Sequence, residues 1–305
     1  MKISSYETKE FIIKKIQGDG VYYNVCEDKN YYYIPDFKNC FINCVRKDFS
    51  EIKKFFYRKK KFNITYKNFK FYSPHDIFYH SKNNIFLISE MNKSRILVIK
   101  NNTLEKIIKF NKLKPSSISL IDKNYYFSFY KSNEDYRVYN TNFELINNYK
   151  NFKLSNPHYF KKFKNQIFIV DSHNNRIIKI TGKNRHYYLG GMKKAINGWK
   201  QKIIKNIKNL SRSFFNIPVD VNFDYSGNLY VSDCYNNRIL KISPQGKVVR
   251  SFNDLISFVT NKKTKENNIF KLNNPYSFYF KKNKIVLADR KNNSIQILIS
   301  KSSIF

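Results

Sequence analysis

The clearest structural signal in the chain is residues 216–252, NIPVDVNFDYSGNLYVSDCYNNRILKISPQGKVVRSF. This segment contains four short runs of β-branched and aromatic residues, each bounded by turn residues. The runs predict strands at Val219–Phe223, Leu229–Ser232, Arg238–Ser243 and Lys247–Phe252. A single four-stranded meander cannot bury both of its faces, so we expect it to be one unit of a repeat.

The same order of strands and turns recurs along the chain. Residues 156–180 and 274–299 copy it closely, residues 73–110 copy it moderately, and residues 114–149 and the segment from Val21 keep only its rhythm. In five copies an acidic residue marks the same point, and these anchors are Asp36, Glu90, Asp171, Asp233 and Asp289. They are 54, 81, 62 and 56 residues apart, and the longest interval spans two units. The chain therefore divides into six units of roughly fifty residues, a period typical of propeller blades.

Residues 216–252 closely resemble the NHL repeat, with the pattern NxPxxVxxDxxGNLYVSDxxNNRIxKxxPxGKVVRSF. The resemblance covers most of the chain and implies an all-β, six-bladed β-propeller of four-stranded antiparallel blades. We expect one domain over residues 1–305, with a long basic insertion at 191–215. The expected blades are approximately 21–57, 73–110, 114–149, 156–189, 216–252 and 274–299.

The last unit has no fourth strand of its own, because only KSSIF follows Ile299. A separate strand is predicted near the N-terminus, at Lys9–Ile16, and its sequence resembles the fourth strands at 105–110 and 247–252. We therefore expect the N-terminal strand to complete the C-terminal blade. A closed propeller exposes few strand edges, which favours a monomer.

The composition is strongly basic but is that of a folded protein. The chain has 57 Lys and Arg against 22 Asp and Glu, a formal net charge of +35, with 42% hydrophobic and 17% aromatic residues. Disordered chains are poor in aromatic residues, and no apolar run is long enough for a membrane helix or a secretory signal. These features predict a cytoplasmic protein without integral membrane contact. The charge has two explanations that stay open, an anionic partner or the amino-acid bias of an AT-rich coding sequence.

The most conspicuous local motif is Asp-x-x-Asn-Asn-Arg, at Asp171–Arg176 and Asp233–Arg238. Repeated arginines at one end of a propeller could bind phosphate. Asp and Asn also form hydrogen bonds with the backbone of a turn, and the Arg could pair with the Asp. Since a functional residue need not recur in several blades, we interpret these residues as structural.

Two histidines stand at equivalent places in predicted first strands. His75 and His158 each follow a proline, and the corresponding residues of other blades are Ser116, Val219 and Tyr276. First strands line the central channel of a propeller, and some NHL-like propellers are lyases that hold a metal there with histidines. A catalytic zinc needs about three protein ligands and only two positions are occupied, so we predict no metal and no cofactor.

The remaining histidines and the cysteines show no pattern of a site. His173 is expected in a turn, and His80 and His186 in loops. The four cysteines (Cys26, Cys40, Cys44 and Cys234) are expected to be small buried or half-buried thiols, with Cys44 in a third strand and Cys40 in the turn before it. No nucleophile elbow, HExxH or phosphate-binding glycine loop occurs, so the sequence favours a protein without catalytic activity.

Positive charge is dense in the segments that connect blades. Residues 53–61 and 191–215 carry no acid, and a helix with an apolar stripe is predicted in the second, either packed on the propeller or available to a partner. The predicted partner-binding residues of this basic face are Arg58, Lys59, Lys60, Lys61, Lys193, Lys194, Lys200, Lys202, Lys205, Lys208 and Arg212. Other lysines fall in turns on the opposite face and argue against a single basic patch, since amino-acid bias would place charge on both faces; they are Lys161, Lys162, Lys164, Lys281, Lys282 and Lys284.

Three functional hypotheses follow. The first is a non-catalytic NHL-type binding platform whose basic face meets an anionic partner, with single-stranded RNA as the first candidate. The second is a channel-mouth lyase or hydrolase that uses His75 and His158 with a metal. The third is a protein–protein interaction scaffold in which the charge is incidental.

Overall fold

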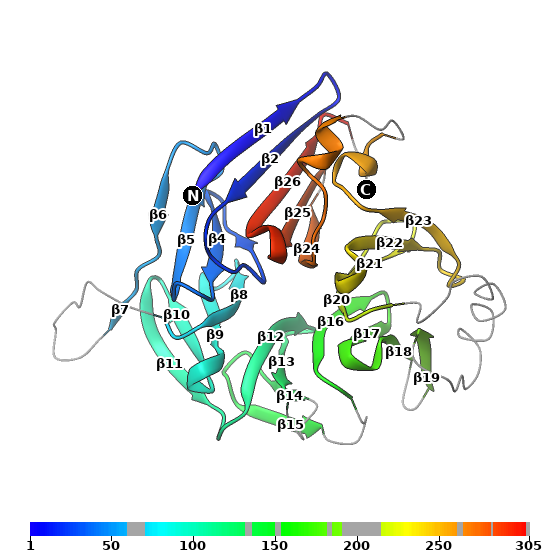
Figure 1. Ribbon diagram of the computed structural model, residues 1–305. Coiled ribbons are helices and arrows are strands. Elements are labelled where there is room, and N and C mark those ends of the chain that lie inside the picture. The colour runs from blue at the N-terminus through cyan, green and yellow to red at the C-terminus, as the bar shows by residue number, and fades with distance from the viewer. Residues whose placement is uncertain are drawn as a thin grey trace. The chain divides into compact units, whose positions relative to one another are not determined.

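The computed structural model describes residues 1–59, 71–131, 136–149, 154–181, 185–190, 215–260, 265–281 and 283–302. Its described strands form six sheets, antiparallel except for one short parallel edge strand, and the fold is a six-bladed β-propeller (Figure 1). The strands group into two compact units, which are described separately. One comprises residues 18–151 with Met1, and the other comprises residues 2–17 and 152–305.

The first unit contains blades 1, 2 and 3. Blade 1 consists of β3 (Cys26–Glu27), β4 (Tyr31–Asp36), β5 (Phe41–Arg46) and β6 (Ile52–Lys54). Blade 2 consists of β8 (Pro74–His80), β9 (Ile85–Glu90), β10 (Arg95–Lys100) and β11 (Thr103–Lys109), with β7 (Arg58–Lys59) parallel to β11 at its outer edge. Blade 3 consists of β12 (Lys114–Ile121), β13 (Asn124–Tyr130), β14 (Tyr136–Tyr139) and β15 (Leu145–Tyr149).

The second unit contains blades 4, 5 and 6. Blade 4 consists of β16 (Pro157–Phe163), β17 (Gln166–Asp171), β18 (Arg176–Thr181) and β19 (Arg185–Gly190). Blade 5 consists of β20 (Pro218–Phe223), β21 (Leu229–Asp233), β22 (Arg238–Ile242) and β23 (Val248–Phe252). Blade 6 consists of β24 (Pro275–Lys281), β25 (Lys284–Asp289) and β26 (Ser294–Ser300), followed by β2 (Phe11–Gln17) and β1 (Lys2–Glu7).

Short 3-10 helices occupy the connections. Those between second and third strands are η1 (Met91–Lys93), η2 (Ser172–Asn174), η3 (Cys234–Asn236) and η6 (Arg290–Asn292). Two more lie between blades 5 and 6, η4 (Ile256–Phe258) and η5 (Lys265–Asn268). No helix in the described part of the chain has the length and apolarity needed to cross a bilayer.

The predicted closure of the C-terminal blade is confirmed. β2 pairs antiparallel with β26 from Phe11 opposite Ser300 to Gln17 opposite Ser294. β1, which we did not predict, pairs with β2 as a fifth strand. Phe11 and Ile13 of β2 are buried with Leu298 in the core between blades 5 and 6, so the N-terminal strand contributes to packing as well as to hydrogen bonding.

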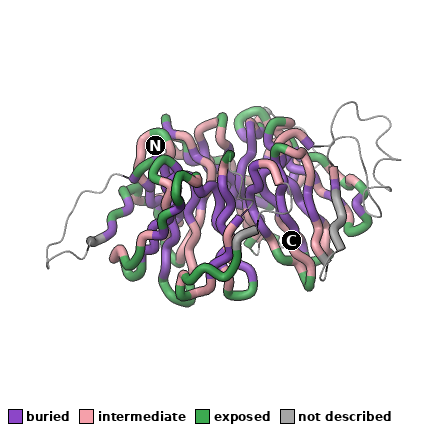
Figure 2. Tube along the Cα trace, turned by 90° about the horizontal axis from the view of Figure 1, so that it is seen from below, coloured by how far each residue is buried: buried purple, intermediate pink, exposed green. Residues whose placement is uncertain are grey.

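The hydrophobic core lies between neighbouring blades of each unit. One cluster joins blades 1 and 2, another joins blades 2 and 3, a third joins blades 4 and 5, and a fourth joins blades 5 and 6. Strand interiors are accordingly buried and exposed residues gather at the turns (Figure 2). Within the units, first strands contact one another, β8 with β3 and β12, and β20 with β16 and β24.

The four strands predicted in residues 216–252 are confirmed as β20–β23, with bounds that differ by one residue at several ends. Two loop predictions are wrong. His80 is the last residue of β8, where its Nδ1 lies 2.8 Å from the Tyr125 hydroxyl, and His186 lies in β19. Neither position carries a local turn or strand signal strong enough to place a histidine from sequence.

Candidate functional site

The Asp-x-x-Asn-Asn-Arg turns are structural, as predicted. Arg238 Nε donates to Asp233 Oδ2 at 2.7 Å, and the Asn236 amide donates to the same oxygen at 2.9 Å. Asp233 Oδ1 accepts the backbone N–H of Asn216 at 2.7 Å, which fixes the segment entering the blade. Asp171 and Arg176 repeat the pair in blade 4 at 2.5 Å. The carboxylates are fully buried, so the arginines serve the turn and are not displayed for a partner.

The second Asn of each motif joins one blade to the next. Asn175 and Asn237 adopt left-handed backbone conformations, with φ of 52° and 54°, which Asn tolerates better than most residues. The Asn175 side-chain oxygen accepts the N–H of Ile217, and that of Asn237 accepts the N–H of Asn274, both at 2.8 Å. The repeated asparagines therefore set the spacing of blades 4, 5 and 6.

Blade 6 departs from this pattern because Ser294 occupies the position of the arginine. Its acid, Asp289, accepts hydrogen bonds instead from the side chains of Asn292 at 2.6 Å and Gln296 at 2.7 Å, and from the N–H of Asn273 at 2.8 Å. Burial raises the pKa of Asp289 to about 6, and these hydrogen bonds only partly offset that effect.

Two first-strand acids join blades in a way that sequence analysis missed. Asp76 Oδ2 accepts the N–H of Ile118 in blade 3 at 2.6 Å, and Asp220 Oδ2 accepts the N–H of Phe278 in blade 6 at 3.1 Å. Burial raises the pKa of Asp220, and Lys161, whose Nζ is 3.9 Å away, only partly offsets it. The available signal was the occurrence of an acid at the third residue of two first strands that each begin with a proline.

His75 is held inside the first unit. It is only 5% exposed, its Nδ1 lies 2.7 Å from the Ser116 carbonyl oxygen, and its ring stacks on Tyr23 with centroids 4.2 Å apart. Phe37 packs edge-on against it at 6.1 Å. These contacts fix the ring orientation and are those of a packed histidine.

His158 is held in the same manner in the second unit. It is 5% exposed, and its Nε2 lies 3.3 Å from the hydroxyl of Tyr276, two blades along the chain. Val219, the equivalent residue of the intervening blade, is fully buried. His75 and His158 belong to different units, so their shared position at a channel mouth stays a prediction. The described residues contain no group of three side chains suited to holding a metal ion.

The cysteines match the expectation of small thiols. Cys44 lies in β5 with Cys40 in the preceding turn, and Cys44 and Cys234 are buried while Cys26 and Cys40 are partly buried. Burial raises the pKa of Cys44 and of Cys234 to about 12, so both thiols are protonated near neutral pH and are poor nucleophiles.

Most residues of the predicted basic face lie outside the described residues. These are Lys60, Lys61, Lys193, Lys194, Lys200, Lys202, Lys205, Lys208 and Arg212, and the helix predicted around Trp199 lies there as well. The backbone of Arg58 and Lys59 forms β7, where a connection between blades was expected.

A second group of basic residues lies in the turns of blades 4 and 5 and in adjoining strand segments of blades 4, 5 and 6, so Lys161, Lys162, Lys281 and Lys284, which were predicted in turns, belong to strands. In an antiparallel meander the turn between strands one and two and the turn between strands three and four are at the same end of the blade. We call the lysines at this end of the second unit the lysine surface, namely Lys161, Lys162, Lys164, Lys241, Lys247, Lys281 and Lys284. Two described carboxylates, those of Asp220 and Asp224, lie beside the lysines of blades 4 and 5. Both residues are at most 9% exposed, and they already pair with Lys161 and Lys241 respectively. Sequence analysis noted most of these lysines but did not join them into one surface.

No family model and no curated protein matches the chain. Among solved structures, a catalytically inactive virginiamycin B lyase from Staphylococcus aureus with quinupristin aligns with a TM-score of 0.62 at 15% identity, covering 95% of this chain and 99% of that chain. A putative gluconolactonase aligns with a TM-score of 0.61 at 7% identity over 97% and 94% of the two chains. A chain of a nidogen/laminin complex aligns with a TM-score of 0.54 at 14% identity over 80% and 92%. At these identities the similarity establishes the propeller fold and carries no activity.

Proposed function

We propose that this protein is a non-catalytic, NHL-type binding platform for an anionic macromolecule, with single-stranded RNA as the first candidate. The observation that carries the proposal is the lysine surface at one end of blades 4–6. Among its exposed members are Lys162, Lys164 and Lys247. Lysine-rich surfaces bind nucleic acid largely through phosphate neutralisation, which releases counterions.

The test is binding of an unstructured RNA over a series of salt concentrations. The logarithm of the association constant should fall linearly with the logarithm of salt, with a slope of about −0.7 for each phosphate neutralised on a single strand. The triple variant K162Q/K164Q/K247Q should bind more weakly and lose about 2 units of slope, one contact for each lysine.

The matched control is K82Q/K100Q/K123Q, which removes the same charge from exposed positions at the corresponding ends of blades 2 and 3. It should keep most of the slope that the first variant loses. If both triple variants lose slope equally, the charge acts diffusely and the lysine surface is not the binding face. If the unmodified protein does not bind RNA at low salt, the proposed function is wrong.

The contacts of the two histidines favour this platform over a channel-mouth enzyme, although the solved relatives include lyases. Both rings are 5% exposed and each has a partner in its own unit, Ser116 for His75 and Tyr276 for His158. Metal analysis of the purified protein separates the two functions, since a bound, stoichiometric metal would favour the enzyme. A partner that is still captured after nuclease treatment would instead favour the protein-interaction scaffold.

A further inference from the structure

The most exposed large apolar residue in the described part of the chain is Tyr225, in the turn between β20 and β21. Its exposed fraction is 86%, and the next highest, that of Val249, is 56%. In blades 1 to 4 the turn between the first and second strands carries an exposed lysine instead, and these lysines are Lys29, Lys82, Lys123 and Lys164. Blade 5 therefore displays an aromatic ring where the other blades display a charge.

The turn that carries Tyr225 is held by hydrogen bonds between its two ends. Asp224 Oδ1 accepts the N–H of Asn228 at 2.9 Å, and the Asn228 side-chain amide donates to Asp224 Oδ2 at 2.9 Å. The N–H of Gly227 donates to the Asp224 carbonyl oxygen at 3.0 Å, and Gly227 has a φ of 81°, which a side chain would strain. The backbone of Tyr225 is thus positioned before a partner binds, so binding would restrict mainly its side chain, which has few rotatable bonds.

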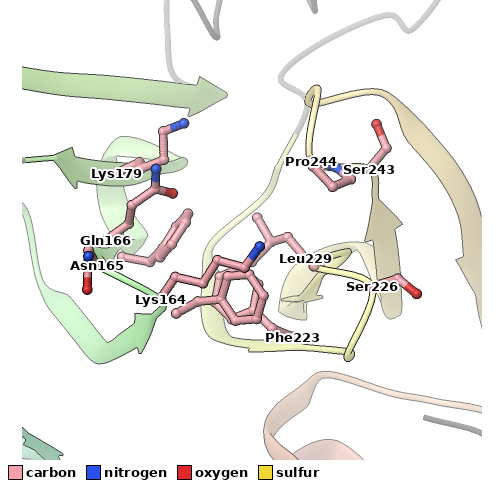
Figure 3. A pocket seen from close by; sticks show the side chains of 12 residues that line it. Lys164, Asn165, Gln166, Lys179, Phe223, Ser226, Leu229, Ser243 and Pro244 are labelled. Carbon is pink, nitrogen blue, oxygen red and sulfur yellow. The ribbon is translucent and has the colours of Figure 1, made fainter.

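Tyr225 stands among the residues of the lysine surface. Its neighbour Ser226 lines a cavity of about 370 Å³ between the turns of blades 4 and 5, and Lys164 of blade 4 lines the same cavity (Figure 3). A Cβ atom on Gly227 would lie 3.3 Å from the Phe163 ring, so the turns of the two blades are closely packed. The ring of Tyr225 and the exposed ammonium group of Lys164 therefore belong to adjacent turns.

A second turn at the same end of blade 5 adds another lysine. Ser243 also lines the cavity, and its N–H donates to the carbonyl oxygen of the exposed Lys247 at 2.8 Å. The acid next to Tyr225 is Asp224, which is 9% exposed and whose Oδ2 lies 3.2 Å from Lys241 Nζ. None of the described residues that line the cavity is acidic. An exposed ring between basic turns suits a ligand that combines phosphates with flat rings.

We propose that Tyr225 stacks on an unpaired nucleobase of the strand whose phosphates the lysine surface neutralises. This inference rests on the proposed function and adds to it a residue that distinguishes unpaired from paired bases. Every base has a flat face on which an aromatic ring can stack, so the contact does not require a particular sequence. In a duplex the bases are already stacked and paired, so Tyr225 contributes to the binding of a single strand and not to that of a duplex.

The experiment measures the affinity of the full chain for three labelled ligands by fluorescence anisotropy. They are an oligouridylate of about ten nucleotides, which is within the range of single-strand site sizes, an abasic strand of equal length and an RNA duplex. The abasic strand keeps the phosphates but has no base to stack, so it should bind about tenfold more weakly than the oligouridylate.

Three variants locate the contact. Tyr225→Ala should weaken the oligouridylate about tenfold and leave the affinities for the abasic strand and the duplex unchanged. Its salt slope should equal that of the unmodified protein, because no phosphate contact is lost. Tyr225→Phe keeps the ring and should bind like the unmodified protein. The matched control is Tyr235→Ala, which removes a ring that is 47% exposed from η3, at the opposite end of blade 5, and it should have no effect.

The outcomes separate this inference from the proposed function. If Tyr225→Ala binds the oligouridylate as tightly as the unmodified protein does, or weakens the duplex equally, Tyr225 does not stack on a base. The RNA platform still stands in that case, provided that the unmodified protein binds RNA and that K162Q/K164Q/K247Q loses slope. If Tyr235→Ala weakens the oligouridylate as much as Tyr225→Ala does, the assignment to this turn is overturned. Absence of RNA binding at low salt rejects the platform and this inference together.

Discussion

Replacement of Arg238 by Met should expose the energetic role of the buried ion pair that the repeat places in its turns. Asp233 is fully buried, and the Arg238 side chain is 23% exposed. The substitution keeps an unbranched side chain of similar length along the strand but removes the guanidinium that donates to Asp233 at 2.7 Å. The carboxylate then keeps only the Asn216 N–H and the Asn236 amide as donors.

The expected loss is about 3 kcal/mol of unfolding free energy at pH 7. Removing one partner of a buried pair costs about 3–5 kcal/mol, and the lower end applies because two hydrogen bonds remain and water reaches the arginine side. Arg238 lowers the pKa of Asp233 against the effect of burial. Burial already raises the pKa of Asp233, and loss of Arg238 should raise it further.

This shift makes the loss depend on pH. When folding raises the pKa of an acid, the stability that the acid contributes decreases as the pH rises. The decrease begins at the pKa of the unfolded state, about 4, and continues through the pKa of the folded state. The deficit of Arg238→Met relative to the unmodified protein should therefore be larger at pH 7 than at pH 5. Urea unfolding at both pH values measures it, and Asp233→Asn/Arg238→Met should recover part of the loss at pH 7.

The control is Arg46→Met, at an ion pair with Asp48 in which both side chains are more than half exposed. It should change the urea midpoint little, because exposed pairs are screened by solvent. If Arg238→Met is no more costly than Arg46→Met, or if its cost is the same at pH 5 and pH 7, the buried pair does not act as argued.

Three further predictions concern the joins between strands and blades. Deletion of residues 1–17 should abolish cooperative unfolding measured by circular dichroism, because it removes β2 from the core of blade 6. Deletion of residues 1–8 alone should have a milder effect. Equal effects of the two deletions would contradict the closure by β2. Ser232→Ala removes a hydrogen bond of 2.5 Å to the Pro275 carbonyl oxygen and should lower the unfolding free energy by about 1–2 kcal/mol, whereas the exposed Ser226→Ala should not. Because its raised pKa costs stability as the pH rises from about 4 to 6, Asp289→Asn should flatten the decrease in unfolding free energy over that range. An unchanged pH profile would show that Asp289 does not titrate there.

The fold was largely predictable because its determinants are local and repeated. Each anchoring acid, with the asparagines after it, lies within a few residues of the turn it stabilises, so the motif appears in the sequence as a contiguous pattern. The pairing of β2 with β26 was also predictable, since a missing fourth strand and a surplus N-terminal strand are both visible in sequence. β1 was not, because its mostly exposed and half-exposed residues carry no core pattern.

The candidate sites were less predictable because they depend on contacts between blades. His158 and Tyr276 are 118 residues apart, and only the folded blades bring them together.

A repeat protein therefore offers its own reference for deciding which unusual residues are structural and which indicate a ligand. Ser294 replaces the arginine of the turn motif, and blade 6 compensates within the chain, because the Gln296 and Asn292 side chains donate to Asp289. A replacement that is accompanied by new donors within the same blade keeps the buried acid satisfied, so the departure of blade 6 from the repeat is structural.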